Sequence, residues 1–225
     1  MSGDRSSASS TSDTLEVCET FVSLCGETLW QGLPAFFVRV GGCNLRCKWC
    51  DTAYAWQPGK AQSTDSLLEE ALRTRLALAV ITGGEPLLQS GSLTLASALA
   101  AQGWIVLIET NGTLPIVEID ERVSYIVDVK PPSAAASVPF LTANLERLRS
   151  VDELKFVVTD RADFDHAVRF VEDHALVGRC GLLISPAHGS IEPSLVADWI
   201  IALGAPLRLQ LQLHKILWGP DARGR

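Results

Sequence analysis

Three cysteines lie within one short segment of the chain, at Cys43, Cys47 and Cys50, in the pattern C-x3-C-x2-C. Three thiolates on one tight loop can bind three irons of a cubane cluster and leave the fourth iron without a protein ligand. An open iron of this kind is a reaction site. The alternatives are a structural zinc, with a fourth ligand from Cys18, Cys25, Cys180 or a histidine, and chance clustering of buried cysteines. Structural zinc sites usually use two separated ligand pairs, so the triplet favours the cluster.

A second motif, ITGGEP at residues 81–86, directly follows a run of apolar residues. Its glycines allow the backbone to approach a ligand closely, and Glu85 is suited to an ammonium group. Taken alone, the motif is typical of a simple turn. Trp49, directly before the third cysteine, can lie against an adenine ring, although an aromatic residue there can equally pack the loop onto the fold.

The composition sets limits on what these motifs can serve. The chain has 225 residues, of which 47% are hydrophobic and 20% charged, as expected for one globular domain with a core large enough to need no disulfides. The net charge of -7 argues against general binding to nucleic acids or anionic membranes. No long apolar run and no signal-peptide pattern is visible, so we expect a cytoplasmic protein whose thiols stay reduced.

Apolar, β-branched runs alternate with segments of helical spacing, which predicts right-handed βαβ units and a parallel sheet. Seven strands are too few for a closed eight-fold barrel, so we predict an α/β fold, an open, partial TIM-like barrel with a reduced set of helices. In such folds the site lies at the C-terminal ends of the strands. The predicted strands are Phe36 to Val40, Leu78 to Thr82, Trp104 to Glu109, Tyr125 to Lys130, Glu153 to Val158, Gly181 to Ser185 and Leu207 to Leu213.

Four helices are predicted between these strands, after Ser63 to Asp65, around Leu93 to Ala100, after Asp160 and after Pro193. The first thirteen residues contain almost no apolar side chains and cannot bury enough surface to become ordered. We therefore expect a flexible tail at 1–13 and a single domain at 14–225.

In this order and at these strand ends, the cysteine loop and the GGEP motif resemble those of the radical S-adenosylmethionine (SAM) superfamily. The resemblance implies a 4Fe-4S cluster whose open iron binds the amino and carboxylate groups of SAM, and whose electron cleaves the sulfonium to a 5'-deoxyadenosyl radical. The cofactor then carries the difficult chemistry, while the protein positions the substrate and excludes solvent.

Further stretches narrow the match: ETFVSLCGE, PAFFVRVGGCNLRCKWCDT, IETNGT, VDVKPPS, ELKFVV and LQLHKILWG. In this order they resemble the 7-carboxy-7-deazaguanine synthase family. The resemblance implies a lyase that converts 6-carboxy-5,6,7,8-tetrahydropterin to 7-carboxy-7-deazaguanine and ammonia, in queuosine biosynthesis. It also implies Mg2+, a homodimer and an electron donor such as flavodoxin or ferredoxin, with neither nucleic acid nor membrane as a partner.

The resemblance implies roles for individual residues. Glu27 would accept N–H groups of the substrate's aminopyrimidine ring, and Arg39 would hold its ring carboxylate. Cys25 departs from the family pattern, which has glutamine there, and a thiol cannot replace both groups of an amide. The implied substrate-binding residues are Cys25, Gly26, Glu27, Arg39 and Thr82; the SAM-binding residues are Trp49, Gly84, Glu85, Thr110, Asn111, Asp128 and Lys130; the magnesium ligand is Thr52; and the catalytic candidates are Glu109 and His214.

Some of these residues, together with Asp51 and the strand-end residue Lys155, also have a structural interpretation. Thr52 and Asp51 could merely cap the loop, Lys155 could pair with Asp152 or Glu153, and His214 could be a core histidine. Another radical SAM enzyme, such as a glycyl-radical activase, and a non-catalytic iron–sulfur module remain as alternative functions. The sequence also leaves open whether residues 220–225 cover the site.

Overall fold

The computed structural model describes residues 13–225, so most of the predicted tail, residues 1–12, lies outside the described residues. Asp13, the first described residue, forms two hydrogen bonds with the rest of the chain. Its carbonyl accepts the N–H of Thr64 at 2.9 Å, and its carboxylate accepts the hydroxyl of Thr94 at 2.5 Å. Among the described residues, no helix is long and apolar enough to cross a membrane.

A nine-stranded sheet runs through the molecule in the order β3-β1-β2-β4-β5-β6-β7-β8-β9. The seven strands from β2 onward pair in parallel, whereas β1 pairs antiparallel with β2 and β3. The sheet does not close, which confirms the open barrel. Its strands are β1 Thr14–Leu24, β2 Pro34–Val40, β3 Lys60–Ser63, β4 Leu78–Gly83, β5 Ile105–Thr110, β6 Val123–Asp128, β7 Glu153–Val158, β8 Gly181–Pro186 and β9 Arg208–Leu209.

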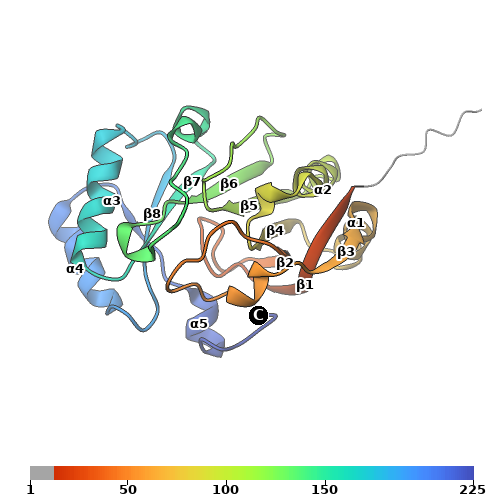
Figure 1. The fold of residues 1–225 in the computed structure, drawn as a ribbon, viewed down its shortest axis with the longest axis horizontal. Helices are drawn as coiled ribbons and strands as arrows, with labels where there is room; N and C mark the ends of the chain where they lie inside the picture. The colour runs from red at the N-terminus through yellow and green to blue at the C-terminus, as the bar shows by residue number, and fades with distance from the viewer. Residues whose placement is uncertain (1–12) are drawn as a thin grey trace, which may run out of the picture.

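The helices lie mostly at the two ends of the sheet: α1 and α2 beside the first strands, and α3 and α4 beside the last ones (Figure 1). The predicted signals begin two of them, since Ser63 accepts the N–H of Ser66 and Asp160 that of Asp163. The crossovers into β6 and β7 contain no α-helix, which confirms the reduced set. The helices are α1 Thr64–Arg73, α2 Ser90–Ala101, α3 Arg161–Asp173, α4 Pro193–Leu203 and α5 Leu213–Trp218; the 3-10 helices are η1 Ala53–Trp56, η2 Pro86–Leu88, η3 Pro132–Ala134 and η4 Thr142–Arg147.

Both faces of the parallel sheet are buried, which is why its strands are continuous apolar runs. On β4, Ala79 and Ile81 belong to the large core, whereas Leu78 and Val80 belong to a smaller interior cluster. Trp30, from the loop between β1 and β2, packs against this interior cluster. Part of this loop therefore packs inside the barrel.

Three sequence predictions differ from the structure. The predicted strand Leu207 to Leu213 is reduced to the two residues of β9, because Leu213 begins α5. The strands β1 and β3 were not predicted: β1 carries charged residues within its apolar pattern, and β3, KAQS, is a polar edge strand. These two strands extend the sheet on the side where the cysteine loop begins.

Candidate active site

A cavity of about 630 Å³ opens at the C-terminal ends of the parallel strands. Cysteines of the predicted cluster line one part of it, and residues 220–225 also line it, so the end of the chain covers the site. Of the predicted site residues, all except Glu85 are in its wall: Cys25, Gly26, Glu27, Arg39, Cys43, Cys47, Trp49, Cys50, Thr52, Thr82, Gly84, Glu109, Thr110, Asn111, Asp128, Lys130 and His214.

The cysteine loop connects β2 to η1. Its thiols are free, with Cys47 buried and Cys43 and Cys50 partly exposed to the cavity. Among the described residues, no three His, Cys, Asp or Glu side chains converge as ligands of a single metal ion. A cubane places each thiolate on a different iron, so its ligands need not meet at one point. The donor set therefore suits a cluster of several irons.

Backbone contacts fix the base of the cysteine loop against the GGEP turn. The N–H of Gly84 bonds the carbonyl of Val40 at 2.9 Å, and the N–H of Glu85 bonds the carbonyl of Gly42 at 2.8 Å. A Cβ atom on Gly84 would overlap the carbonyl of Gly42. Glycine is therefore required there for two backbones to meet, rather than only for a turn.

Glu85 is fully buried, and its carboxylate accepts three hydrogen bonds within the protein. The donors are the hydroxyl of Thr110 at 2.8 Å, the N–H of Asn111 at 2.7 Å and the N–H of Leu87 at 2.9 Å. The expected contact between Glu85 and an ammonium group of the cofactor is thus not what the geometry offers. Glu85 instead positions the TNGT turn.

Asn44, within the cysteine loop, joins that loop to the TNGT turn. Its Oδ1 accepts from Asn111 Nδ2 at 2.9 Å, and its Nδ2 donates to Thr113 Oγ1 at 2.8 Å. Asn44 could not be singled out from the sequence, because an asparagine between two cysteines carries no signal by itself. The cysteine loop, the GGEP turn and the TNGT turn form one hydrogen-bonded unit.

A chain of buried charges crosses the cavity wall. Lys155 Nζ donates to Glu27 Oε2 at 2.7 Å and lies 3.7 Å from Asp128 Oδ2, while Gln212 Nε2 donates to Glu27 Oε1 at 2.7 Å. Burial opposes ionisation of Glu27, but the Lys155 ammonium and these hydrogen bonds outweigh it and lower the pKa of Glu27. Lys155 pairs with neither Asp152 nor Glu153. Lys155, which the sequence placed at a strand end without assigning it a role, and Gln212, which it did not single out, are thus candidate site residues.

Arg39 is placed by two residues that the sequence did not identify. Its Nε donates to Glu19 Oε1 at 2.8 Å, and the same oxygen accepts the hydroxyl of Tyr54 at 2.8 Å. A guanidinium has five N–H groups, so its remaining donors are available to an anion in the cavity. On the neighbouring strands, Thr82 donates to Glu109 at 2.6 Å, and burial raises the pKa of Glu109.

Three further predicted residues have distinct surroundings. The ring of His214 packs against Gly26, and burial lowers its pKa. The thiol of Cys25 donates to the carbonyl of Glu27 at 3.0 Å, and burial raises its pKa to about 11, so it is a neutral thiol. The hydroxyl of Thr52 forms no capping bond to η1 and lies 3.7 Å from the sulfur of Cys50; Asp51 pairs with Lys215.

Two buried polar atoms in the cavity wall have no hydrogen-bond partner among the described residues: Trp49 Nε1 and Asp128 Oδ1. Buried polar atoms normally have a partner, so an unpaired donor and acceptor in one cavity fit a polar ligand. Lys130 connects them, since its Nζ donates to Asp128 Oδ2 at 2.8 Å and lies 5.3 Å from the centre of the Trp49 ring. These residues are among those predicted to bind SAM.

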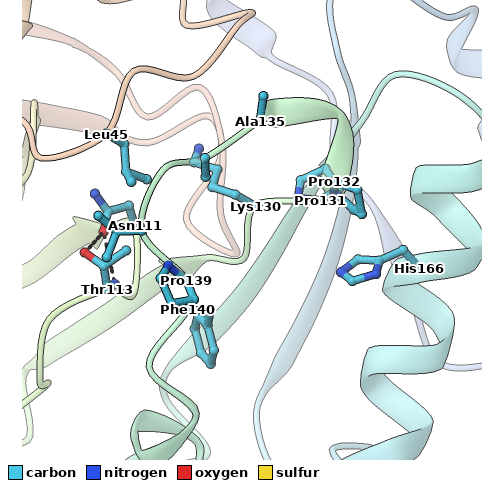
Figure 2. Close-up of a pocket in the computed structure, with 12 residues that line it drawn as sticks. Leu45, Asn111, Thr113, Lys130, Pro131, Pro132, Ala135, Pro139, Phe140 and His166 are labelled. Atoms are coloured by element: carbon cyan, nitrogen blue, oxygen red, sulfur yellow. Dashed lines mark hydrogen bonds between the residues drawn. The ribbon is translucent and has the colours of Figure 1, made fainter.

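A smaller cavity of about 210 Å³ lies behind this wall (Figure 2). Asn111 and Thr113 line one side, the loop of residues 130–140 passes through the middle, and His166 on α3 lies on the other side. Leu45, Asn111 and Lys130 line both cavities. The two cavities therefore share part of their lining.

Comparison with known proteins agrees with this geometry. The Radical SAM superfamily model matches residues 37–171. The 7-carboxy-7-deazaguanine synthase of Chlorobaculum tepidum is 40% identical over 218 residues, covering 96% of this chain and 99% of that protein. The synthase of the same name from Thermoplasma acidophilum is 39% identical over 205 residues, covering 90% of this chain and 97% of that protein.

Solved structures show the same fold. The crystal structure of QueE from Escherichia coli superposes with a TM-score of 0.74 at 26% identity, covering 89% of this chain and 95% of that one. SuiB of Streptococcus suis bound to S-adenosylmethionine, at 15% identity and a TM-score of 0.52, shares the fold alone. The chain thus belongs to the 7-carboxy-7-deazaguanine synthase family of the radical SAM superfamily.

Proposed function

We propose that this protein is a radical SAM lyase that converts 6-carboxy-5,6,7,8-tetrahydropterin to 7-carboxy-7-deazaguanine and ammonia. The product differs from the substrate only by the elements of ammonia, so SAM is needed as a catalyst and not as a net oxidant. The observation that carries the proposal is that one cavity is lined both by the three cysteines and by Glu27 and Arg39.

Cys43, Cys47 and Cys50 would hold the 4Fe-4S cluster, and the unpaired atoms of Trp49 and Asp128 support SAM binding beside it. Bound there, the cluster and SAM would supply the 5'-deoxyadenosyl radical. Burial of the surrounding wall excludes water and competing hydrogen donors from the radical.

The other side of the cavity suits the pterin. Glu27 stays ionised beside Lys155 and can accept N–H groups of the amino-oxopyrimidine ring, while the N–H groups of Arg39 that do not contact Glu19 can hold the ring carboxylate. Glu109, whose pKa is raised by burial and whose carboxylate accepts the hydroxyl of Thr82, is a candidate proton carrier. His214 is a second proton carrier. The relatives named 7-carboxy-7-deazaguanine synthase do not favour a glycyl-radical activase.

Thr52 would bind Mg2+ together with carboxylate and carbonyl oxygens of the substrate. Magnesium usually keeps several waters and takes only one or two protein ligands, so a single hydroxyl is sufficient. The absence of a capping bond from Thr52 supports this role. In a magnesium titration, Thr52→Ala should lose the response to the metal while keeping its cluster; an unchanged response would remove Thr52 from the site.

The remaining partners follow from the reaction. We expect an acidic electron carrier such as flavodoxin or ferredoxin to reduce the cluster, in the cytoplasm, and a homodimer as the working form. The two are tested separately, by comparing reduction by the carrier with reduction by dithionite, and by measuring the molecular mass in solution.

The experiment for the function is anaerobic incubation of the reconstituted protein with the carboxytetrahydropterin, SAM, Mg2+ and dithionite, watched for the deazaguanine chromophore. Arg39→Ala should lose a charge-assisted contact and so weaken turnover about ten- to hundred-fold, with the cluster intact. Arg75→Ala, on the surface before β4, is the matched control and should change nothing. Wild-type protein that holds the cluster and cleaves SAM but forms no deazaguanine would contradict the proposal.

A further inference from the structure

Lys155 lies between the two halves of the active-site cavity. It projects from β7, it is buried, and its ammonium is surrounded by carboxylates from three different segments. It donates to Glu27 at 2.7 Å and lies 3.7 Å from Asp128, which is beyond hydrogen-bond length. One charge is therefore shared unequally between two acids.

The two carboxylates face different ligands under the proposed function. Glu27 belongs to the loop after β1 that would bind the pterin ring, and Asp128 ends β6 where SAM would bind. Asp128 Oδ2 already accepts from Lys130 at 2.8 Å, whereas its Oδ1 is buried without a partner among the described residues. The orientation of Asp128 thus decides whether Oδ1 can accept a hydrogen bond from a ligand.

The charges around the cavity make the position of the Lys155 ammonium sensitive to bound pterin. Around the cavity, the ammonium groups of Lys130 and Lys155 face the carboxyl groups of Glu27, Glu109 and Asp128. Ring N–H donors that bind Glu27 compete with Lys155 for the oxygens of Glu27. The ammonium can then close the 3.7 Å gap to Asp128 and hold it with Oδ1 toward the cavity.

We propose that Lys155 is a positioning residue that couples binding of the pterin at Glu27 to binding of SAM at Asp128. The inference rests on the proposed function. By thermodynamic reciprocity, each ligand raises the affinity for the other by the same factor. Couplings of this kind are usually in the range of about 5- to 150-fold, and one shared ammonium without a large conformational change should give about tenfold.

The test is the dissociation constant of SAM, measured by equilibrium dialysis on protein with an oxidised cluster, with and without the carboxytetrahydropterin. Without a reductant no turnover occurs, so the measurement reports binding alone. In the wild type, the pterin should tighten SAM binding about tenfold. Lys155→Met keeps the length of the side chain but not its charge. In this variant, the ratio of the SAM dissociation constants without and with the pterin should fall to about one.

Lys60→Met is the matched control, because Lys60 is exposed on β3 and should keep the wild-type ratio. Should Lys155→Met fail to fold or to hold its cluster, Asp128→Asn decides: it should bind the pterin as the wild type does but lose the ratio. A wild-type ratio of one, or a wild-type ratio retained in Lys155→Met or Asp128→Asn, overturns the coupling. Product formation by the same wild-type preparation with dithionite tests the function separately, so the two can fail independently.

Discussion

β7 carries two buried charged residues, Glu153 and Lys155, which face the same side of the strand and both contact the loop after β1. Near the cavity, the ammonium of Lys155 is close to several carboxylates and is held charged. At the other end, the carboxylate of Glu153 accepts, among the described residues, only the N–H of Leu29, at 3.1 Å, and burial raises the pKa of Glu153 to about 7. Burial thus has opposite consequences along one strand: with a charged partner it fixes ionisation, and without one it favours the neutral form.

The largest expected effect comes from breaking the pair near the cavity. Glu27→Ala leaves the Lys155 ammonium without its closest carboxylate, and removing one partner of a buried pair costs about 3 to 5 kcal/mol. We expect the free energy of unfolding to fall by about 3 kcal/mol, since Asp128 remains nearby, and turnover to fall at least about 100-fold. Denaturant titration and product formation measure the two effects.

A double variant sharpens this prediction. Glu27→Gln with Lys155→Met removes both charges, and should recover most of the lost stability but not the turnover. If Glu27→Ala lowers the free energy of unfolding by less than about 1 kcal/mol, the Glu27–Lys155 pair contributes no more than an exposed salt bridge. That result would contradict the difference drawn between the two ends of β7.

At the other end of β7, stability should depend on pH through Glu153. Its pKa in the folded protein, about 7, is above the usual value of a glutamate, so the folded protein keeps a proton that the unfolded chain loses. This contribution is complete below the unfolded pKa and disappears as the pH rises through 7, by about 3 kcal/mol in all. Glu153→Gln mimics the protonated form, so its unfolding free energy should fall less between pH 5 and 8. If the unfolding free energies of the wild type and Glu153→Gln depend equally on pH, the prediction is wrong.

Glu85 provides an intermediate case, a buried carboxylate with three donors but no cation bonded to it. Glu85→Gln keeps the shape but turns one acceptor into a donor that faces other donors. We expect a loss of about 2 kcal/mol in stability, because hydrogen bonds to charged groups contribute about 1.5 to 3 kcal/mol. Weaker SAM binding should accompany it, since Glu85 positions Thr110 and Asn111. Calorimetric titration with SAM checks this; full affinity would show that the TNGT turn holds its position alone.

The smallest effect is expected at Cys25, a buried residue without a charged role. Its thiol is neutral at physiological pH and donates to a carbonyl of its own loop. Cys25→Ser keeps that donor, so turnover should stay within about threefold and stability within about 1 kcal/mol. Cys25→Gln, the family's residue, should retain or improve activity. Inactivation of both variants would mean that the thiol itself takes part.

Elements whose signal lies in a few consecutive residues could be predicted from the sequence. Buried parallel strands are continuous apolar runs, so residues 78–82 and 153–158 were predicted nearly to the residue, and their ends located the site. Lys155 could not be assigned in this way, because its partner Glu27 is 128 positions earlier in the chain. A buried ion pair of that separation exists only once the sheet brings β7 beside the loop after β1.

Glu85 shows the opposite limit. Its residue type and its place in the motif suggested a ligand contact, yet two of its three donors come from the turn that it supports and the third, the N–H of Leu87, comes from η2. A motif therefore indicates that a carboxylate is needed at a position, but not whether it acts on the ligand or on the protein around it. Only the geometry separates the two.

The backbone contact between Gly42 and Gly84 has a consequence for how this scaffold can diversify. Because the base of the cysteine loop is fixed by main-chain bonds and by the absence of side chains, its position does not depend on which residues face the substrate. Under the proposed function, mutation can change the predicted substrate-binding residues at positions 25 and 39 while the position of the cysteine loop is kept. Evolution or directed selection toward new substrates should therefore spare these glycines and accumulate changes on the opposite wall.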